Sequence, residues 1–267
     1  MKFKEEIIMA FKLGDVIIDR IQYGVAEDFD GNLLYVLSQL TEATINISAE
    51  SKEAKDKDGT LVKKFWRGKT GTFEAKNAML NLNVVGSASG GDPLFASSTK
   101  AIAMPKIVTV SAKETIKLDG VVDGTVQVNA YDANGTMGKS YSKDASASAT
   151  NYSLSADGTL TPPTDSEVER YIVKYDRTVD NGIAVYNKAD QFPGTVKLTL
   201  KALCVDPCTA DTLRACYIVL PSFQVSPEVS LSLQTDSQLD YKGDLQVAYC
   251  SLDKTLYEFY MAADDEE

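Results

Sequence analysis

The chain has 267 residues, of which 44% are apolar and 24% charged, and its formal net charge is −11. A chain of this length can bury a substantial core in one or two domains. The acidic balance disfavours broad contact with nucleic-acid phosphates or anionic lipid, because like charges repel. The sequence contains no histidine, which removes the common Ser-His, Cys-His and zinc-hydrolase arrangements and argues against an enzyme. We expect no cofactor.

The amino-terminal residues do not read as a targeting segment. Lys2 and Lys4 are followed at once by Glu5 and Glu6, which spoils a signal-peptide pattern. No run approaches the roughly 18 apolar residues that a membrane helix needs. We therefore expect a protein that folds in a cytoplasm and has no membrane contact.

Most of the chain is predicted to be β, because alternating polarity and β-branched or aromatic residues recur along it. Asp58-Gly59, Asp123-Gly124, Asn134-Gly135 and Asp157-Gly158 are typical hairpin turns. Antiparallel sheets follow. Outside the arm described below, the expected strands are Asp15–Ile21, Ile107–Ser111, Thr125–Ala130, Val168–Tyr175, Gly182–Tyr186, Thr195–Leu203, Leu213–Leu220, Val229–Leu233, Leu245–Leu252 and Leu256–Tyr260.

Two short helices are predicted early in the chain. Asn32 is a candidate cap for a segment that carries Leu34, Leu37 and Leu40. Asn77 is a candidate cap for a second segment, which carries Leu80, Val84 and Val85 and is closed by Gly86. The sequence Asp28–Asn32 has the acidic start of a calcium loop, but Leu33 and Gln39 stand where the loop needs glycine and glutamate. We interpret it as a surface turn.

A long hairpin arm is predicted between these two segments. Residues Ala43–Ala49 alternate in polarity, a charged turn follows at Lys55–Thr60, and a second strand returns from Leu61. Between Glu50 and Thr70, seven basic and four acidic side chains give the arm a net charge of +3, opposite in sign to the whole chain. A basic arm on an acidic body favours self-association, because opposite potentials steer encounter. Gly68-Lys69-Thr70 ends like a phosphate-binding loop, but strand-like residues follow it, so we discard that motif.

The central block is predicted to be a separate small domain. Met104-Pro105 opens it and Gln191–Gly194 closes it, which leaves about the length of a small β-sandwich. The predicted domains are therefore residues 1–104 with 192–267, and an inserted domain at 105–191. Ser140 and Lys143 have the spacing of some acyl-transfer nucleophiles, but their surroundings carry no helix signal, so we interpret them as a solvated loop.

The four cysteines do not form a convincing metal site. Only Cys204 and Cys208 have the spacing of a zinc-ligand pair, whereas Cys216 and Cys250 lie in strand-like surroundings. We expect reduced thiols that pack as small hydrophobes in a cytoplasm. A zinc site and a disulfide remain alternatives at this point.

Two regions of the chain resemble the tail tube proteins of tailed bacteriophages. The first is the order of strand, arm Ser51–Lys69, return strand Lys69–Phe73 and capped segment Asn77–Gly86. The second is the pair of closing strands Arg214–Val225 and Val229–Leu233. The resemblance implies a mainly β fold, an antiparallel β-sandwich or barrel with a long hairpin arm, plus an inserted immunoglobulin-like domain.

In that family, six copies form a ring around a continuous inner β-barrel, and the rings stack into a tube that conducts DNA. The resemblance thus implies a structural protein of the virion tail, assembled in the host cytoplasm, with itself and possible sheath or terminator proteins as partners. The arm corresponds to the loop that reaches an adjacent ring. The expected inter-ring residues are Lys52, Lys55, Lys57, Lys63, Lys64 and Arg67.

Two other functions stay open from the sequence. One is a head decoration or capsid-associated protein, which would also be a virion component. The other is a carbohydrate-binding or adhesive β-sandwich module that uses Trp66 and exposed tyrosines to stack on sugars. Because Trp66 lies between Phe65 and Arg67, we interpret it as an anchor in a core or an interface.

Overall fold

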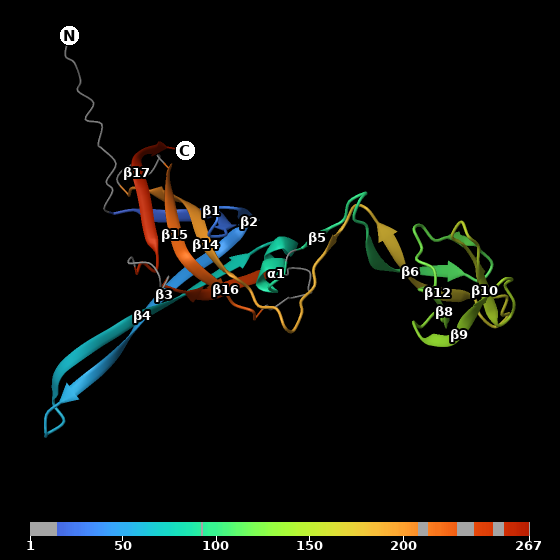
Figure 1. The fold of residues 1–267 in the computed structure, drawn as a ribbon, viewed down its shortest axis with the longest axis horizontal. Helices are drawn as coiled ribbons and strands as arrows, with labels where there is room; N and C mark the ends of the chain where they lie inside the picture. The colour runs from blue at the N-terminus through green and yellow to red at the C-terminus, as the bar shows by residue number, and fades with distance from the viewer. Residues whose placement is uncertain (1–14, 92, 208–212, 229–237, 248–253, 267) are drawn as a thin grey trace, which may run out of the picture. The chain divides into compact units, whose positions relative to one another are not determined.

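The computed structural model describes residues 15–91, 93–207, 213–228, 238–247 and 254–266. Contacts divide the chain into two compact units. The main unit combines both ends of the chain, Met1–Pro93 and Val185–Glu267, and the central unit is Leu94–Ala184. Both units are built from strands, and the described residues contain one short helix (Figure 1). The predicted mainly β fold with antiparallel sheets is confirmed.

The main unit is an eight-stranded, barrel-like antiparallel sheet. Its strand order is β2-β1-β14-β15-β16-β4-β3, and β17 pairs with β15 off this path. The amino-terminal strands are β1 (Ile17–Glu27), β2 (Leu33–Leu37), β3 (Leu40–Lys55) and β4 (Leu61–Asn77). The carboxyl-terminal strands are β14 (Thr195–Val205), β15 (Leu213–Val225), β16 (Leu239–Leu245) and β17 (Glu258–Glu266).

The core of the main unit follows from alternation along these strands. Odd-numbered residues of β16, and of β4 from Gly71 onward, face inward, so that Phe73 lies opposite Gly243 and next to Tyr241. The rings of Phe73, Phe223 and Tyr241 meet edge to face or tilted, with centroids 5.5 to 6.3 Å apart. Aromatic pairs in this geometry add to the stabilisation from burial. Even-numbered residues of the same strands form the opposite, polar face.

The second predicted helix is present and the first is wrong. Helix α1 (Leu82–Ala88) begins one turn later than expected, because Asn81 is its cap and accepts from the backbone N–H groups of Asn83 and Val84. Asn77 ends β4 instead, where its buried amide accepts from Gln39 N–H and donates to the Met79 carbonyl. The leucines after Asn32 lie in β2 and β3, because the pairing of β2 with β1 and of β3 with β4 overrides the helical spacing.

The central unit holds a seven-stranded sheet in the order β6-β12-β8-β9-β10-β11-β7. All its pairings are antiparallel except that of β9 with β10. Its core is formed by buried valines, leucines and tyrosines, among them Tyr171 and Val173. The strands are β6 (Ile102–Ser111), β7 (Ile116–Lys117), β8 (Gln127–Tyr131), β9 (Met137–Asp144), β10 (Asn151–Leu154), β11 (Thr159–Thr161) and β12 (Arg170–Val179). A separate two-stranded sheet pairs β5 (Leu94–Phe95) with β13 (Ile183–Ala184).

The strand predictions can be compared with the described residues. Most expected strands overlap an observed one, whereas Val229–Leu233 and most of Leu245–Leu252 lie outside the described residues. The loop expected at Ser140 and Lys143 is wrong, because both residues belong to β9. Tyr141 is the one buried residue of that strand, and its ring packs edge-on against Tyr171. With a single buried side chain, the strand shows too little polar-apolar alternation to be recognised from the sequence.

The four predicted hairpin glycines, Gly59, Gly124, Gly135 and Gly158, all have positive φ. The turn at Gly158 also carries a charge-dependent network. The Asp157 carboxylate accepts hydrogen bonds from the hydroxyls of Ser155 and Thr159, and these bonds lower its pKa from 3.8 to about 2. Because the charged form is favoured in the fold, this stabilisation is present above about pH 4 and is lost as the pH falls towards 2.

We expect the Asp157→Asn variant to lose part of the acid sensitivity of the fold. The wild-type melting temperature should fall more steeply between pH 4 and pH 2 than that of the variant, because the Asp157 carboxylate takes up a proton more readily in the unfolded chain than in the folded turn, and the variant lacks this group. Thermal melts followed by circular dichroism at half-unit pH intervals measure both slopes. Parallel slopes in this window would contradict the assigned network.

The cysteine prediction needs correction. Cys204 and Cys216 lie on neighbouring strands β14 and β15, are fully buried, and form a disulfide. They are therefore not packed free thiols, and Cys204 is not available to zinc. The sequence pairs Cys204 more closely with Cys208, and only the antiparallel pairing of β14 with β15 brings Cys216 near. Cys208 and Cys250 lie outside the described residues.

Removing this crosslink should destabilise the main unit. The two cysteines are 12 residues apart in sequence, and a disulfide that closes a loop of this size contributes about 3 kcal/mol. We expect the Cys204→Ala/Cys216→Ala variant to lose about 2 to 4 kcal/mol of unfolding free energy in urea denaturation. A reducing agent should lower the wild-type midpoint and leave the double variant unchanged. An equal response of both proteins would contradict the assignment.

Candidate assembly surface

The predicted arm is the most exposed part of the main unit. The distal halves of β3 and β4 form a two-stranded antiparallel ribbon that projects from the sheet (Figure 1). Every residue from Ser51 to Thr70 is exposed. At the tip, the Asp56 carboxylate accepts from the backbone N–H groups of Asp58 and Thr60, and Gly59 takes the positive φ that closes the turn. The ribbon is thus ordered by its own hydrogen bonds.

Each face of the arm carries an aromatic ring beside a lysine. The register pairs Ser51 with Trp66 and Lys52 with Phe65, so alternation places the two rings on opposite faces. The Lys64 ammonium lies 4.6 Å from the Trp66 ring centroid, and Lys63 lies 5.3 Å from that of Phe65. Trp66 is 65% exposed and Phe65 49% exposed. Neither ring belongs to the core of this chain, so the expected core role is wrong, and the interface role stays a prediction.

The six predicted interface bases all lie on this arm, but their surroundings differ. Lys55 and Lys64 approach the Glu53 carboxylate at 3.6 and 3.9 Å. No ion pair joins the other four to an acid among the described residues; these four are Lys52, Lys57, Lys63 and Arg67. We call them the unpaired arm bases. Aromatic side chains and arginine are enriched at protein interfaces, and lysines contribute there mainly by steering and orienting association.

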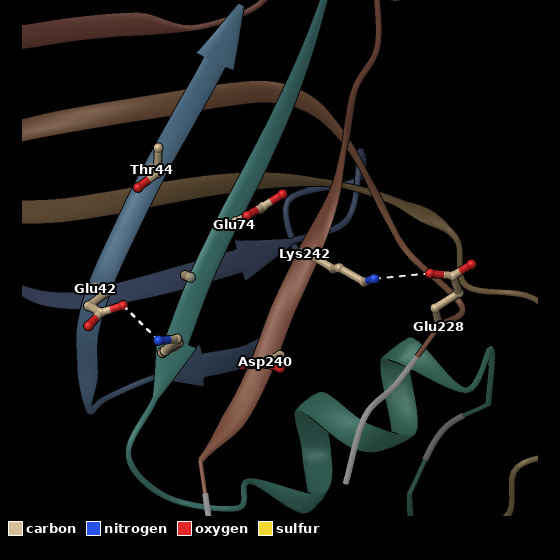
Figure 2. Close-up of a pocket in the computed structure, with 8 residues that line it drawn as sticks. Glu42, Thr44, Glu74, Glu228, Asp240 and Lys242 are labelled. Carbon is tan, nitrogen blue, oxygen red and sulfur yellow. Dashed lines mark hydrogen bonds and ion pairs between the residues drawn. The ribbon is translucent and has the colours of Figure 1, made fainter. Parts of the chain in front are cut away.

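A polar hollow lies at the root of the arm, on the outward face of β3, β4 and β16 (Figure 2). It has a volume of about 360 Å³. Cross-strand register brings Lys76 between Glu42 and Asp240, and Glu74 between Thr44 and Lys242. Glu228 contributes from the segment after β15. The hollow therefore holds four carboxylates and two ammonium groups: Glu42, Glu74, Glu228 and Asp240, with Lys76 and Lys242.

Two ion pairs hold the rim of this hollow. Lys76 Nζ lies 2.9 Å from Glu42, and Lys242 Nζ lies 3.0 Å from Glu228. The pKa of Lys76 is raised, first by its hydrogen bond to Glu42, and the pKa of Lys242 is raised, first by its bond to Glu228. Sequence reasoning missed the hollow, because it needs β16 beside β4. The alternation of Asp240, Lys242 and Asp244 with apolar residues is the signal that could have located it.

The rejected motifs take ordinary places in the fold. Asp28–Asn32 is the turn between β1 and β2, where the Asp28 carboxylate accepts from the side chain and backbone of Asn32, which lowers its pKa. Gly68, Lys69 and Thr70 lie in β4, as a strand reading requires. Among the described residues, the single helix has seven residues and is too short to cross a bilayer.

Comparison with known proteins identifies a family. A search of curated proteins finds no match to this chain. A sequence model described as the YomU/Tube protein family matches residues 15–253. This range covers every strand of both units except β17. The family name denotes tube proteins, which fits a phage-associated structural role better than an enzymatic one. The chain belongs to the YomU/Tube protein family.

Proposed function

We propose that this chain is the tail tube subunit of a bacteriophage, and that six copies form a ring whose stacking produces a DNA-conducting tube. The observation that carries the proposal is the family match over residues 15–253. The protein acts as a structural component of the virion, without catalysis or cofactor. It assembles in the host cytoplasm and remains in the virion tail.

The exposed sheet edges support assembly through strands. Among the described residues, β2 and β3 end the strand order and β17 pairs on one side with β15. Unpaired strand edges are templates for further pairing. Tyr257, Phe259 and Tyr260 at β17 are exposed together, and aromatic side chains of this kind become buried in interfaces. Joining copies edge to edge into a closed barrel satisfies these strands.

The net charge of −11 suits a conduit for DNA. Lysine and arginine hold phosphates through counterion release, so a lumen rich in them would retain the duplex. Carboxylates repel phosphates and leave the duplex free to slide. DNA therefore passes through the lumen of the proposed tube and is not bound in a sequence-specific way.

The arm provides the proposed contact between rings. Its bases Lys52, Lys55, Lys57, Lys63, Lys64 and Arg67 engage acidic positions of a neighbouring ring. The full exposure of this ordered ribbon supports that role, because an isolated hairpin gains little by projecting into solvent. A contact of this head-to-tail kind produces an open filament instead of a closed particle.

The central unit, predicted from the sequence as an insertion at 105–191, is proposed as an immunoglobulin-like decoration outside the tube. Its own core of buried tyrosines and valines supports independent folding. Sheath or terminator proteins are the further partners proposed for the assembled tail.

Negative-stain microscopy of the concentrated purified protein tests this function. Six-fold rings or hollow tubes are the expected result. A protein that stays monomeric at all concentrations would contradict the proposal, and glycan binding by that monomer would favour the carbohydrate-binding alternative. Retention on phage heads without tube formation would favour the head-decoration alternative.

A further inference from the structure

We propose that the polar hollow at the root of the arm is the receptor for the arm of a second copy of this chain. This inference rests on the proposed stacking of rings and names the two surfaces that meet. The occupant is the basic arm, defined by Lys52, Lys57, Lys63 and Arg67, and the receptor is the surface lined by Glu42, Glu74, Glu228 and Asp240.

The hollow has a surplus of negative charge. Four carboxylates face two ammonium groups, which leaves a net charge of −2. Glu42 and Glu228 are each committed to one lysine. No ion pair joins Glu74 or Asp240 to a base among the described residues, and both residues are exposed; in Figure 2 no dashed line reaches either of them. Two carboxylates are therefore available to an incoming base.

The arm has the opposite charge and a matching face. Lys52 and Lys63 share the face of the ribbon that carries Phe65, since Lys52 pairs with Phe65 and Ala54 with Lys63. Among the described residues, neither lysine forms an ion pair. Complementary potentials of this kind set orientation and register when two surfaces meet. The surface suited to the hollow is thus the Phe65 face of the arm.

The arm cannot fill the hollow of its own chain. Arg67 precedes Glu74 by seven residues on the continuous strand β4, and Thr60 at the tip precedes it by fourteen. At about 3.3 Å per residue, the basic part of the ribbon lies about 23 to 46 Å from its own hollow. The continuous pairing of β3 with β4 keeps the ribbon extended. Each hollow must therefore receive the arm of another molecule.

The contact between arm and hollow can repeat from subunit to subunit without forming a closed assembly. The arm and the hollow are different surfaces of one subunit, so their contact is heterologous, and each added copy offers a new arm or a new hollow. The proposed contact thus explains growth along the tube axis separately from ring closure, which uses the strand edges.

Charge reversal on both sides tests the contact in the full-length chain. The arm variant is Lys52→Glu/Lys63→Glu, the hollow variant is Glu74→Lys/Asp240→Lys, and a third protein combines all four substitutions. We expect each double variant to raise the concentration needed for tubes by about tenfold or more, and the combined variant to restore assembly. The matched control is Glu167→Lys/Glu169→Lys, which makes the same charge change in the central unit and should assemble like the wild type.

A crosslink provides a second measurement that does not depend on charge. The Lys63→Cys/Asp240→Cys protein should form covalent chains between subunits when its tubes are oxidised, and neither single cysteine variant should do so. If wild-type protein forms no rings or tubes, the proposed function fails. If wild-type tubes form, but the hollow variant assembles normally and the crosslink is absent, only the receptor assignment fails.

Discussion

Reversing the four unpaired arm bases should abolish tube formation while the subunit stays folded. The variant is Lys52→Glu, Lys57→Glu, Lys63→Glu and Arg67→Glu. These side chains are exposed and form no ion pair among the described residues, so the fold loses little when they change. The proposed contact, in contrast, changes from attraction to repulsion at every layer. Sedimentation and negative-stain microscopy measure assembly, and circular dichroism confirms the fold.

The control variant has the same change in net charge, but the substitutions lie in the central unit instead of the arm. Reversal of Lys100, Lys113, Lys117 and Lys174, which are exposed in the central unit, alters the net charge by the same amount. Tubes should still form, because the arm is intact. Wild-type assembly should also weaken as salt rises, since exposed charges are screened over about 10 Å at 0.1 M. Normal tubes from the arm variant would remove the arm from the assembly mechanism.

The arm could be predicted from the sequence because its signals are local. Strict alternation from Ala43, a dense charged turn and the Asp58-Gly59 pair all lie within one hairpin. The hollow could not be predicted, since it requires Asp240 and Lys242 to lie beside residues of β4 far earlier in the chain. Local patterns specify a hairpin, whereas the order of strands in a sheet depends on long-range pairing.

The errors in the sequence analysis have the same origin. The leucines of β2 have helical spacing, but pairing with β1 uses them in a strand. Asn77 looks like a helix cap, yet its amide satisfies backbone groups where β4 ends. The Cys204–Cys216 disulfide depends on the antiparallel pairing of β14 with β15. In each case a tertiary contact decided between two uses of the same local sequence.

A second large effect is expected in the core of the main unit. Phe73 is fully buried and its ring contacts Phe223 and Tyr241. The Phe73→Ala variant loses the burial of the ring and leaves a cavity, which costs about 3 to 5 kcal/mol. A domain is typically stable by about 5 to 15 kcal/mol, so this loss should bring the main unit close to unfolding. Urea denaturation followed by circular dichroism measures the change.

The same strand supplies the matched control. Phe65→Ala makes an identical chemical change on β4, but Phe65 is 49% exposed on the arm, so its stability should stay within about 0.5 kcal/mol of the wild type. Its assembly should nevertheless weaken, because the ring lies on the face proposed to enter the hollow. The two phenylalanines would thus separate folding from assembly along one strand. Equal losses of stability in both variants would mean that the arm packs against its own body, which would contradict the role of the arm as a free connector between rings.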